Sequence, residues 1–276
     1  MSTSTTKRSG PLAPGVAFVT GGARGLGNAI AVSFAREGAR GVVIVDINPE
    51  TLSEGKKTVE AYGTPCLAVQ ADVTKEEDVE RAIAEAVKEF GRIDYAANFA
   101  GILGPLTATY ETTLESFQKG MAVNSTGVFL CTKHEIIQMM KQDSIEVEEG
   151  RVPQRGAIVN CASLNSQMSI AGSVAYTTSK HAVMGITKTA ALEVREHHIR
   201  VNAISPGFLL TNLLTPIVGT EGGVPIEAWN ALEARQGRSA KFEEVGDVAV
   251  LITSPRMSLV NGANLFVDGG FSISEA

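Results

Sequence analysis

The 276-residue sequence lacks the features of several protein classes. It has no excess of basic residues: its formal net charge is -6 and its isoelectric point is near 5.4. Nucleic-acid and anionic-membrane surfaces need a basic face, so we expect neither partner. No run of about 18 or more apolar residues is present, so we also expect no membrane-spanning helix.

Cysteine is scarce as well. Cys66, Cys131 and Cys161 are widely spaced and form no CxxC pair. This pattern favours reduced, buried thiols in a cytoplasmic protein over a disulfide framework. Residues 1–14 are polar, with Pro and Gly but without the apolar core of a secretory signal, so we interpret them as a disordered tail.

What the sequence does contain is a regular alternation of short β-rich runs and longer amphipathic stretches. With 44% hydrophobic residues, it can bury a large core. Repeated strand–helix–strand units place helices on both faces of a parallel sheet, so residues 15–276 are predicted to form one α/β domain, a doubly wound, Rossmann-like, three-layer fold. Strands are expected at 15–20, 42–46, 66–73, 93–99, 157–162, 199–204 and 263–267, and helices from the first glycine-rich turn to 38, at 49–62, from a capping box at 74–77 to 90, at 111–142 and at 174–197.

Two segments interrupt the alternation. Residues 143–156 are polar and are interpreted as a surface loop. Residues 211–238 are rich in Gly and Pro around Trp229, the only tryptophan. They follow the carboxyl end of an expected strand, where open α/β sheets bind ligands, so we predict that they form a substrate lid.

The first strand is followed by a glycine-rich turn, TGGARGLG at residues 20–27. Glycines at such a turn let the backbone approach a pyrophosphate at the helix N-terminus. The spacing departs from the G-x-G-x-x-G fingerprint, and the alternative is a tight turn with close helix packing. Asp46 ends the second strand 19 positions after Gly27, where a carboxylate bonds the ribose 2′-OH of NAD and repels the 2′-phosphate of NADP. Ile47 adds no cation there.

Arg24 leaves the choice of cofactor open. A cation in the glycine turn could contact a 2′-phosphate, which would favour NADP(H). It could equally be solvated, or paired with Asp46. We favour NAD, because the acid sits where the 2′ position is expected.

The stretch at 160–180, NCASLNSQMSIAGSVAYTTSK, carries the chemistry. Tyr176 and Lys180 are four residues apart, so on a helix they share one face. A phenol, with an ordinary pKa of roughly 10, is a poor base near neutrality, but a neighbouring cation favours the phenolate. Ser163 could hold the oxygen that is oxidised or reduced. The alternatives are a packing tyrosine and a serine that caps a strand end.

These motifs occur together with Asp72-Val73, the NFAG turn at 98–101, Asn124 and Pro206-Gly207. Their order and spacing resemble those of the classical short-chain dehydrogenase/reductases over residues 14–271. IRVNAISPG and GANLFVDGG near the C-terminus extend the resemblance, and the insertion at 143–156 resembles fungal members.

The resemblance implies a role for each matching residue. Tyr176 would be the general acid/base, Lys180 would assist it and hold the nicotinamide ribose, Ser163 would orient the substrate oxygen, and Asn124 would hold a water of a proton relay. Phe99 stands where the family turn has a second asparagine, so packing is expected to replace a hydrogen bond there. The residues expected at the cofactor are Gly21, Arg24, Gly25, Leu26, Gly27, Asp46, Ile47, Asp72, Val73, Asn98, Ala100, Gly101, Tyr176, Lys180, Pro206, Gly207, Phe208 and Thr211.

The expected substrate pocket is largely apolar and has no basic cluster for a phosphate or carboxylate. This favours a lipophilic secondary alcohol or its ketone, such as a cyclic metabolite, with NAD as cofactor and no metal. Its expected lining is Ser163, Leu164, Asn165, Met168, Phe208, Leu209, Leu213, Leu214 and Trp229.

The resemblance also implies a homo-oligomer, a tetramer or dimer, because similar proteins commonly assemble in this way. Three alternatives stay open for the function. They are an NADP(H)-dependent ketone reductase, a nicotinamide-binding sensor without turnover, and a related enzyme that catalyses a cyclisation or elimination.

Overall fold

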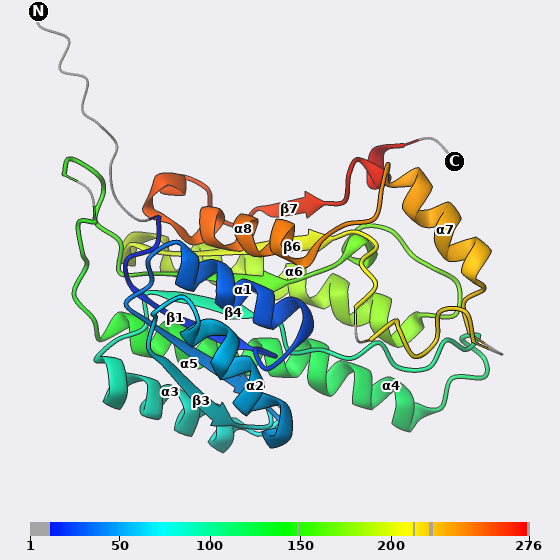
Figure 1. Ribbon diagram of the computed structural model, residues 1–276, viewed down its shortest axis with the longest axis horizontal. Helices are drawn as coiled ribbons and strands as arrows, with labels where there is room; N and C mark the ends of the chain where they lie inside the picture. Colours follow the sequence, from blue (N-terminus) through cyan, green and yellow to red (C-terminus); the bar gives the residue numbers. More distant parts are fainter. Residues whose placement is uncertain (1–11, 148, 212, 221–222, 275–276) are drawn as a thin grey trace, which may run out of the picture.

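The fold is built on a seven-stranded sheet, which the computed structural model describes within residues 12–147, 149–211, 213–220 and 223–274. The strand order is β3-β2-β1-β4-β5-β6-β7, and every neighbouring pair is parallel (Figure 1). The predicted single-domain, doubly wound α/β fold is confirmed. The strands are β1 (Val16–Thr20), β2 (Gly41–Asp46), β3 (Cys66–Gln70), β4 (Tyr95–Asn98), β5 (Gly156–Cys161), β6 (Ile199–Pro206) and β7 (Asn264–Val267).

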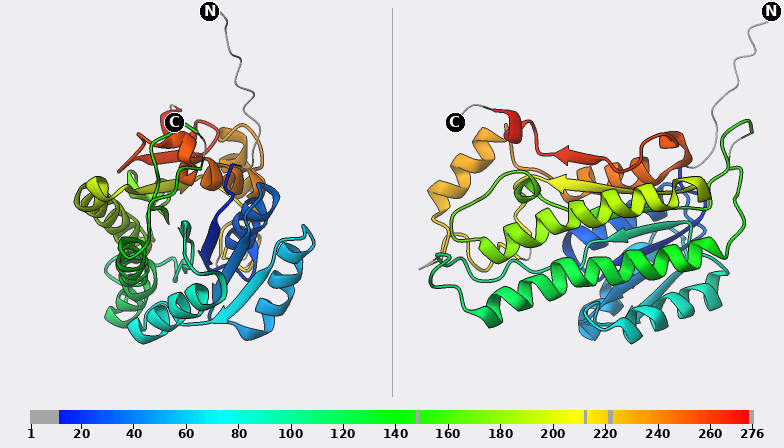
Figure 2. Two further views of the ribbon diagram at one scale, coloured as in Figure 1. Left: turned by 90° about the vertical axis from the view of Figure 1, so that its left-hand side faces the viewer. Right: turned by 180° about the vertical axis from the view of Figure 1, so that it is seen from behind.

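Helices cover both faces of this sheet, as the two views in Figure 2 show. α1, α2 and α8 pack on one face, and α3, α5 and α6 pack on the other. The helices are α1 (Gly25–Arg36), α2 (Pro49–Glu60), α3 (Glu76–Phe90), α4 (Leu114–Met121), α5 (Val128–Met140), α6 (Val174–Val194), α7 (Ile226–Arg235) and α8 (Phe242–Thr253).

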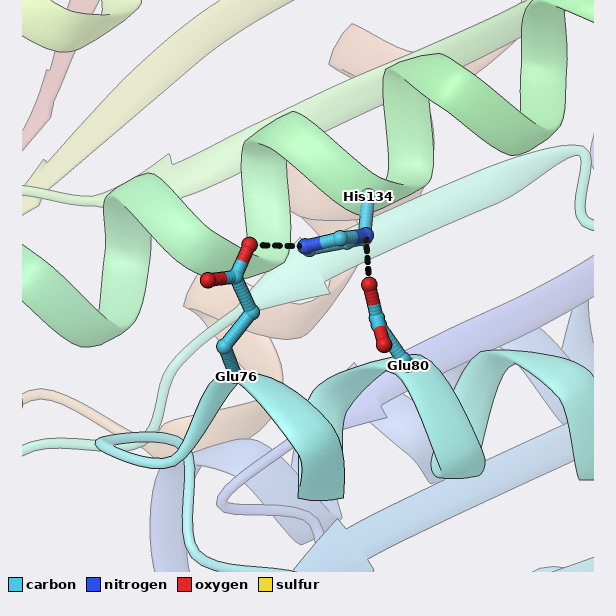
Figure 3. A group of neighbouring side chains, drawn as sticks. All are labelled: Glu76, Glu80 and His134. Atoms are coloured by element: carbon cyan, nitrogen blue, oxygen red, sulfur yellow. Dashed lines mark hydrogen bonds and ion pairs between the residues drawn. The ribbon is translucent and has the colours of Figure 1, made fainter.

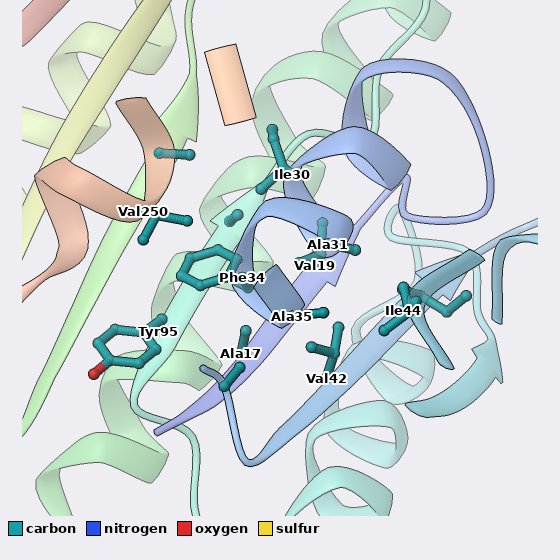
Figure 4. Close-up of a cluster of buried hydrophobic side chains, with 14 of the residues drawn as sticks. Ala17, Val19, Ile30, Ala31, Phe34, Ala35, Val42, Ile44, Tyr95 and Val250 are labelled. Carbon is teal, nitrogen blue, oxygen red and sulfur yellow. The ribbon is translucent and has the colours of Figure 1, made fainter. Parts of the chain in front are cut away.

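Side-chain alternation explains how each central strand serves both faces. In β1, Ala17 and Val19 enter the core under α1, whereas Phe18 enters the core under α3 and α5. Figure 4 shows the first of these cores, where the Phe34 ring of α1 stacks on Tyr95 of β4 at 5.6 Å between ring centres. A strand that is buried on both faces has a continuous apolar run in its sequence. The strands of this sheet can therefore be predicted from the sequence.

Two local expectations were wrong, and two helices were not expected. The helix expected at 111–142 is interrupted by a π-helical segment, η1 (Ala122–Gly127), which separates α4 from α5. No capping box forms at residues 74–77, because Thr74 Oγ1 donates to Asp72 Oδ1 instead, at 2.7 Å. The segment expected to be a lid contains α7, and α8 was not expected at all.

The chain start also differs from expectation. Residues 1–11 of the expected disordered tail lie outside the described residues. Ala13, however, is fully buried, and its N–H donates to the carbonyl oxygen of Glu37 at 3.3 Å. The ordered domain therefore begins before residue 15. Among the described residues, no helix is long and apolar enough to cross a membrane.

Candidate active site

The candidate site lies at the carboxyl edge of the sheet. Because all seven strands are parallel, the segments that follow β1, β2, β4, β5 and β6 emerge at this one edge (Figure 1). The glycine turn, Asp46, Asn98, Ser163 and Pro206 all lie at or just beyond these strand ends. The chain order reverses at β1, between β2 and β4, and such a switch point is where doubly wound sheets bind ligands.

Tyr176 and Lys180 lie on the first turns of α6, as their spacing predicts. The Lys180 ammonium is 5.5 Å from the centre of the Tyr176 ring. Lys180 is only 3% exposed, and its Nζ donates to the main-chain oxygen of Cys161 at 2.7 Å. This bond connects the helix of the two residues to the end of β5. Cys161 was expected to be buried like the other cysteines, but it is partly exposed.

Ser163 follows β5 by two residues and faces the same edge of the sheet. Its Oγ accepts a hydrogen bond from the Asn165 N–H at 3.2 Å, so the hydroxyl proton stays available to another acceptor. The Asn165 side chain is buried and donates to Thr177 Oγ1 at 2.7 Å and to Ser173 Oγ at 3.2 Å. Asn165 therefore braces the loop of Ser163 against the start of α6.

Asn124 lies in the π-helical segment and is fully buried. Its Oδ1 accepts from the Ile102 N–H and its Nδ2 donates to the Ile102 oxygen, both at 2.8 Å. Nδ2 also donates to Ser179 Oγ at 3.2 Å, and Ser179 Oγ in turn donates to the main-chain oxygen of Tyr176 at 2.7 Å. Asn124 thus joins the loop after β4 to α6, while its part in a proton relay stays a prediction.

The glycine turn is packed too closely for side chains. A Cβ on Gly27 would lie 2.2 Å from the Gly21 oxygen, and a Cβ on Gly21 would lie 2.8 Å from the Ala100 nitrogen. Gly21 has a φ of +68°, in the left-handed region that favours glycine. The turn after β1 therefore lies directly against the turn after β4. Phe99 packs on the core, as expected where the second family asparagine is missing.

Asp46 ends β2 beside this turn. Its Oδ2 accepts from the Ala23 N–H at 3.3 Å, and its Oδ1 accepts from the Asn48 N–H at 3.2 Å. Arg24 is exposed and forms no ion pair with Asp46 in the described part of the chain. The cation and the carboxylate thus stand near the same turn without neutralising each other. Ile47 is 61% exposed.

The expected pocket lining divides into two groups. Leu164, Leu209 and Trp229 are each 3% exposed, and Asn165 is buried with them, so their side chains lie behind the surface of the site. The partly or largely exposed members are Ser163, Met168, Phe208, Leu213 and Leu214.

Comparisons with known proteins agree with this geometry. A family model described as Enoyl-(Acyl carrier protein) reductase matches residues 21–272. The short-chain dehydrogenase anuF of Penicillium roqueforti is 39% identical over 268 residues, which cover 94% of this chain and 96% of the relative. The chain belongs to the short-chain dehydrogenase/reductase family. The expected resemblance to fungal members is confirmed by this relative.

Other members of the family extend the comparison. The 2,5-dichloro-2,5-cyclohexadiene-1,4-diol dehydrogenase of Sphingobium indicum is 34% identical over 255 residues, with 92% of this chain and 96% of the relative covered. The crystal structure of levodione reductase superimposes with a TM-score of 0.85 at 31% identity, covering 96% of this chain and 100% of the other. That of 3-ketoacyl-(acyl-carrier-protein) reductase from Brucella melitensis complexed with NADH gives 0.81 at 29% identity, covering 95% and 99%. The protein is therefore an oxidoreductase of alcohol or ketone substrates with a nicotinamide cofactor.

One buried group of this short-chain dehydrogenase was missed in the sequence. Glu135 of α5 is fully buried, and its Oε2 accepts from Asn98 Nδ2 at 2.9 Å. Asn98 Nδ2 also donates to Asn160 Oδ1 at 3.0 Å, so Asn98 holds β4, β5 and α5 together. Burial raises the pKa of Glu135 to about 8, so the carboxyl is protonated at neutral pH. An acid within the apolar run from Val128 to Met140 was the available signal.

A second cluster joins α3 to α5 on the outer side of the enzyme. Figure 3 shows the His134 ring between two carboxylates, with Nε2 2.8 Å from Glu76 Oε1 and Nδ1 3.7 Å from Glu80 Oε1. Lys133 Nζ lies 2.6 Å from the same Glu76 oxygen, and these hydrogen bonds from Lys133 and His134 lower the pKa of Glu76. The carboxylates face opposite ring nitrogens, so the His134 ring links α5 to both acids of α3. The expectation of no metal stays a prediction.

Proposed function

We propose that the enzyme is an NAD-dependent dehydrogenase that interconverts a lipophilic, cyclic secondary alcohol and its ketone. The observation that carries this proposal is the placement of Ser163, Tyr176 and Lys180 at the same sheet edge as the glycine turn and Asp46. This shared edge supports a site in which the proton-transfer groups would meet a bound dinucleotide.

The residues of the glycine turn fit a dinucleotide. The close approaches at Gly21 and Gly27 leave bare backbone at the N-terminus of α1, where a pyrophosphate is favoured by unpaired N–H groups and the helix dipole. The Asp46 carboxylate would accept a hydrogen bond from the ribose 2′-OH. NAD+ bound there would supply a hydride acceptor.

Three side chains of the protein would carry out the proton transfer. Ser163 Oγ already accepts from the Asn165 N–H, which leaves its hydroxyl free to donate to the substrate oxygen. The phenolate of Tyr176 would take the hydroxyl proton of the alcohol as general base. The Lys180 ammonium, held by the Cys161 oxygen 5.5 Å from the centre of the Tyr176 ring, would be the cation that assists this proton transfer.

Apolar side chains around the site support a lipophilic substrate. Leu213 is 42% exposed and Ile170 is also 42% exposed, each on a loop that leaves the carboxyl edge. The loops after β4 and β5 are tied together where the Thr107 N–H donates to the Gly172 oxygen at 3.0 Å. The Sphingobium relative is named for a cyclic diol, which supports a ring-bearing alcohol.

Two further parts of the proposal rest on surface features. An NADP(H)-dependent ketone reductase is the second candidate, because Arg24 is exposed in the glycine turn and forms no ion pair with Asp46 among the residues that the structure describes. A homo-oligomer is supported by apolar side chains on the outer faces of α5 and α6, with Phe129 48% and Leu192 64% exposed.

The test is an absorbance screen for NADH formation with cyclic and open-chain secondary alcohols, with NAD+ and NADP+ side by side. We expect turnover of at least one lipophilic cyclic alcohol and a higher kcat/KM with NAD+. The matched variant Tyr176→Phe should lose about 100-fold or more in kcat while NADH binding is retained. Equal turnover by this variant, or product without NADH, would reject the assignment.

A further inference from the structure

Gln236 occupies an unusual place at the end of α7. It is the residue that follows the last helical turn, and it is only 4% exposed. Its side chain reaches the segment directly after β6, where Gly207 and Phe208 leave the sheet. This segment belongs to the expected nicotinamide side of the site, whereas α7 belongs to the segment that was expected to be a lid.

Both main-chain polar groups of Phe208 are held by this one side chain. Gln236 Oε1 accepts from the Phe208 N–H at 2.7 Å, and Gln236 Nε2 donates to the Phe208 oxygen at 3.1 Å. The second hydrogen of Nε2 goes to the Arg238 oxygen at 3.1 Å. A neighbouring strand normally satisfies such a pair, but the β6–β7 pairing ends at Pro206 and Val267. The glutamine amide therefore takes the place of a strand neighbour.

The backbone around Gln236 is shaped to admit it. A Cβ on Gly207 would lie 2.2 Å from Gln236 Oε1, and a Cβ on Gly269 would lie 2.2 Å from the Gln236 main-chain oxygen. Gly269 has a φ of +60°, which also favours glycine. Two glycines from different strand ends thus leave room for one residue of α7.

The Phe208 ring adds a second connection to the same helix. It meets Trp229 of α7 edge-on at 6.0 Å between ring centres and Phe271 at 4.8 Å. Arg235 lies over the Phe271 ring at 4.3 Å. Phe208 is thus held by its backbone through Gln236 and by its ring through Trp229.

We propose that Gln236 is a positioning residue that sets the backbone of residues 206–208 against the nicotinamide half of the cofactor. The inference rests on the proposed function, because it takes these residues to lie along the nicotinamide. Under this proposal, the nicotinamide half of the dinucleotide site depends on Gln236 and the adenosine half does not. Asp46 and the glycine turn hold the adenosine and pyrophosphate without Gln236, and only the nicotinamide end depends on it.

The experiment compares two ligands in the full-length protein. NAD+ contains the nicotinamide and ADP-ribose lacks it, so calorimetric titration with each separates the two halves of the site without turnover. In Gln236→Leu the main-chain groups of Phe208 lose their partner. We expect NAD+ affinity to fall by about tenfold or more, a loss of the size that unpaired main-chain groups at Phe208 can cause, while ADP-ribose affinity changes less than about twofold.

Kinetics give a second readout that a merely structural role would not move. With NADH deuterated at the transferred position, Gln236→Leu should show a larger isotope effect on kcat, because a misplaced nicotinamide slows the hydride step. Gln236→Glu keeps the size and can still accept from the Phe208 N–H, but it cannot donate to the Phe208 oxygen, so we expect an intermediate effect. It also serves as the second variant if the leucine protein does not fold.

Asn230→Ala, an exposed change on α7, is the matched control and should leave both ligands unaffected. Equal losses of NAD+ and ADP-ribose affinity in the glutamine variants, or no loss of either, would overturn the proposal. A wild-type protein that binds NAD+ but turns over no alcohol would count against the proposed function alone. The two failures are therefore distinguishable.

Discussion

Lys180 of α6 is bonded to Cys161 at the end of β5, with 2.7 Å between Nζ and the main-chain oxygen. The bond holds a buried ammonium 5.5 Å from the Tyr176 ring and ties it to the strand that leads to Ser163. The acceptor is a main-chain oxygen, so the bond fixes the position of the ammonium without pairing it with a carboxylate. The position of this charge is therefore set by the sheet and not only by the helix.

The first prediction concerns this charge. Lys180→Met removes the cation beside the proposed base Tyr176, so kcat/KM for the alcohol should fall by about 100- to 10,000-fold at neutral pH. The measurement is steady-state NADH formation. Lys188→Met, an exposed lysine on the same helix, is the control and should stay within about twofold of wild type. Similar losses in the two variants would contradict a specific role of Lys180.

The second prediction concerns cofactor choice at Asp46. Asp46→Asn removes the charge that repels a 2′-phosphate but keeps an oxygen for the Ala23 or Asn48 N–H. The ratio of kcat/KM with NADP+ to that with NAD+ should rise by about tenfold or more. A tenfold change corresponds to a difference of roughly 1.4 kcal/mol in transition-state free energy between the two cofactors. Glu50→Gln, at the exposed start of α2, should leave the ratio unchanged. A wild-type preference for NADP+ would instead support the role of Arg24.

The third prediction concerns Asn124 as a link between two loops of the site. Asn124→Ala leaves the N–H and oxygen of Ile102 without their side-chain partner in a partly buried position. The free energy of unfolding should fall by about 1–3 kcal/mol, measured by urea denaturation. Hydride transfer should also slow, because the link to Ser179 is lost. Thr126→Ala, at an exposed position in the same π-helical segment, is the control and should change neither the unfolding free energy nor the rate of hydride transfer. An equal effect of Thr126→Ala would contradict a specific linking role of Asn124.

The fourth prediction is a pH dependence from Glu135. Its pKa is raised by burial from 4.5 to about 8 in the folded protein, so the folded state keeps a proton that the unfolded chain loses between these values. Stability therefore falls as pH rises through this window, by about 1.4 kcal/mol per pH unit at its steepest, and levels off above it. Glu135→Gln cannot ionise, so its unfolding free energy should fall less between pH 5 and about 8.5.

Denaturant unfolding at several pH values checks this prediction. Glu89→Gln, an exposed acid on α3, is the control and should keep the wild-type pH dependence. Parallel pH profiles for wild type and Glu135→Gln would show that the buried carboxyl is not the group responsible.

The signals that were legible in the sequence are local ones. A strand buried on both faces is mostly apolar, and a turn that lets the backbone approach a pyrophosphate needs glycines at particular positions, so β1, β2 and residues 20–27 could be located directly. The four-residue spacing of Tyr176 and Lys180 follows from one turn of helix. Such features depend only on residues a few positions apart, so they can be identified from the sequence alone.

Contacts between distant residues were not legible. Nothing near Asn98 indicates that Glu135 lies beneath it, and nothing near Phe208 indicates the amide of Gln236. An amide or carboxyl side chain suits many surroundings, so its residue type does not predict its partner. The sequence around Asn124 likewise predicts a regular helix and not a π-helical segment. The partner of the Asn124 amide is the backbone of Ile102, which lies on a distant loop.

The sequence by itself determined the sheet, the glycine turn and the chemical groups of the site, since each follows from backbone geometry and short-range periodicity. Only the tertiary structure decided how those groups are supported: Lys180 by the Cys161 oxygen, Asn98 by a buried acid, and Phe208 by Gln236. The physical reason is that a hydrogen bond needs its donor and acceptor within about 3 Å, and the packing of whole helices on the sheet sets that distance.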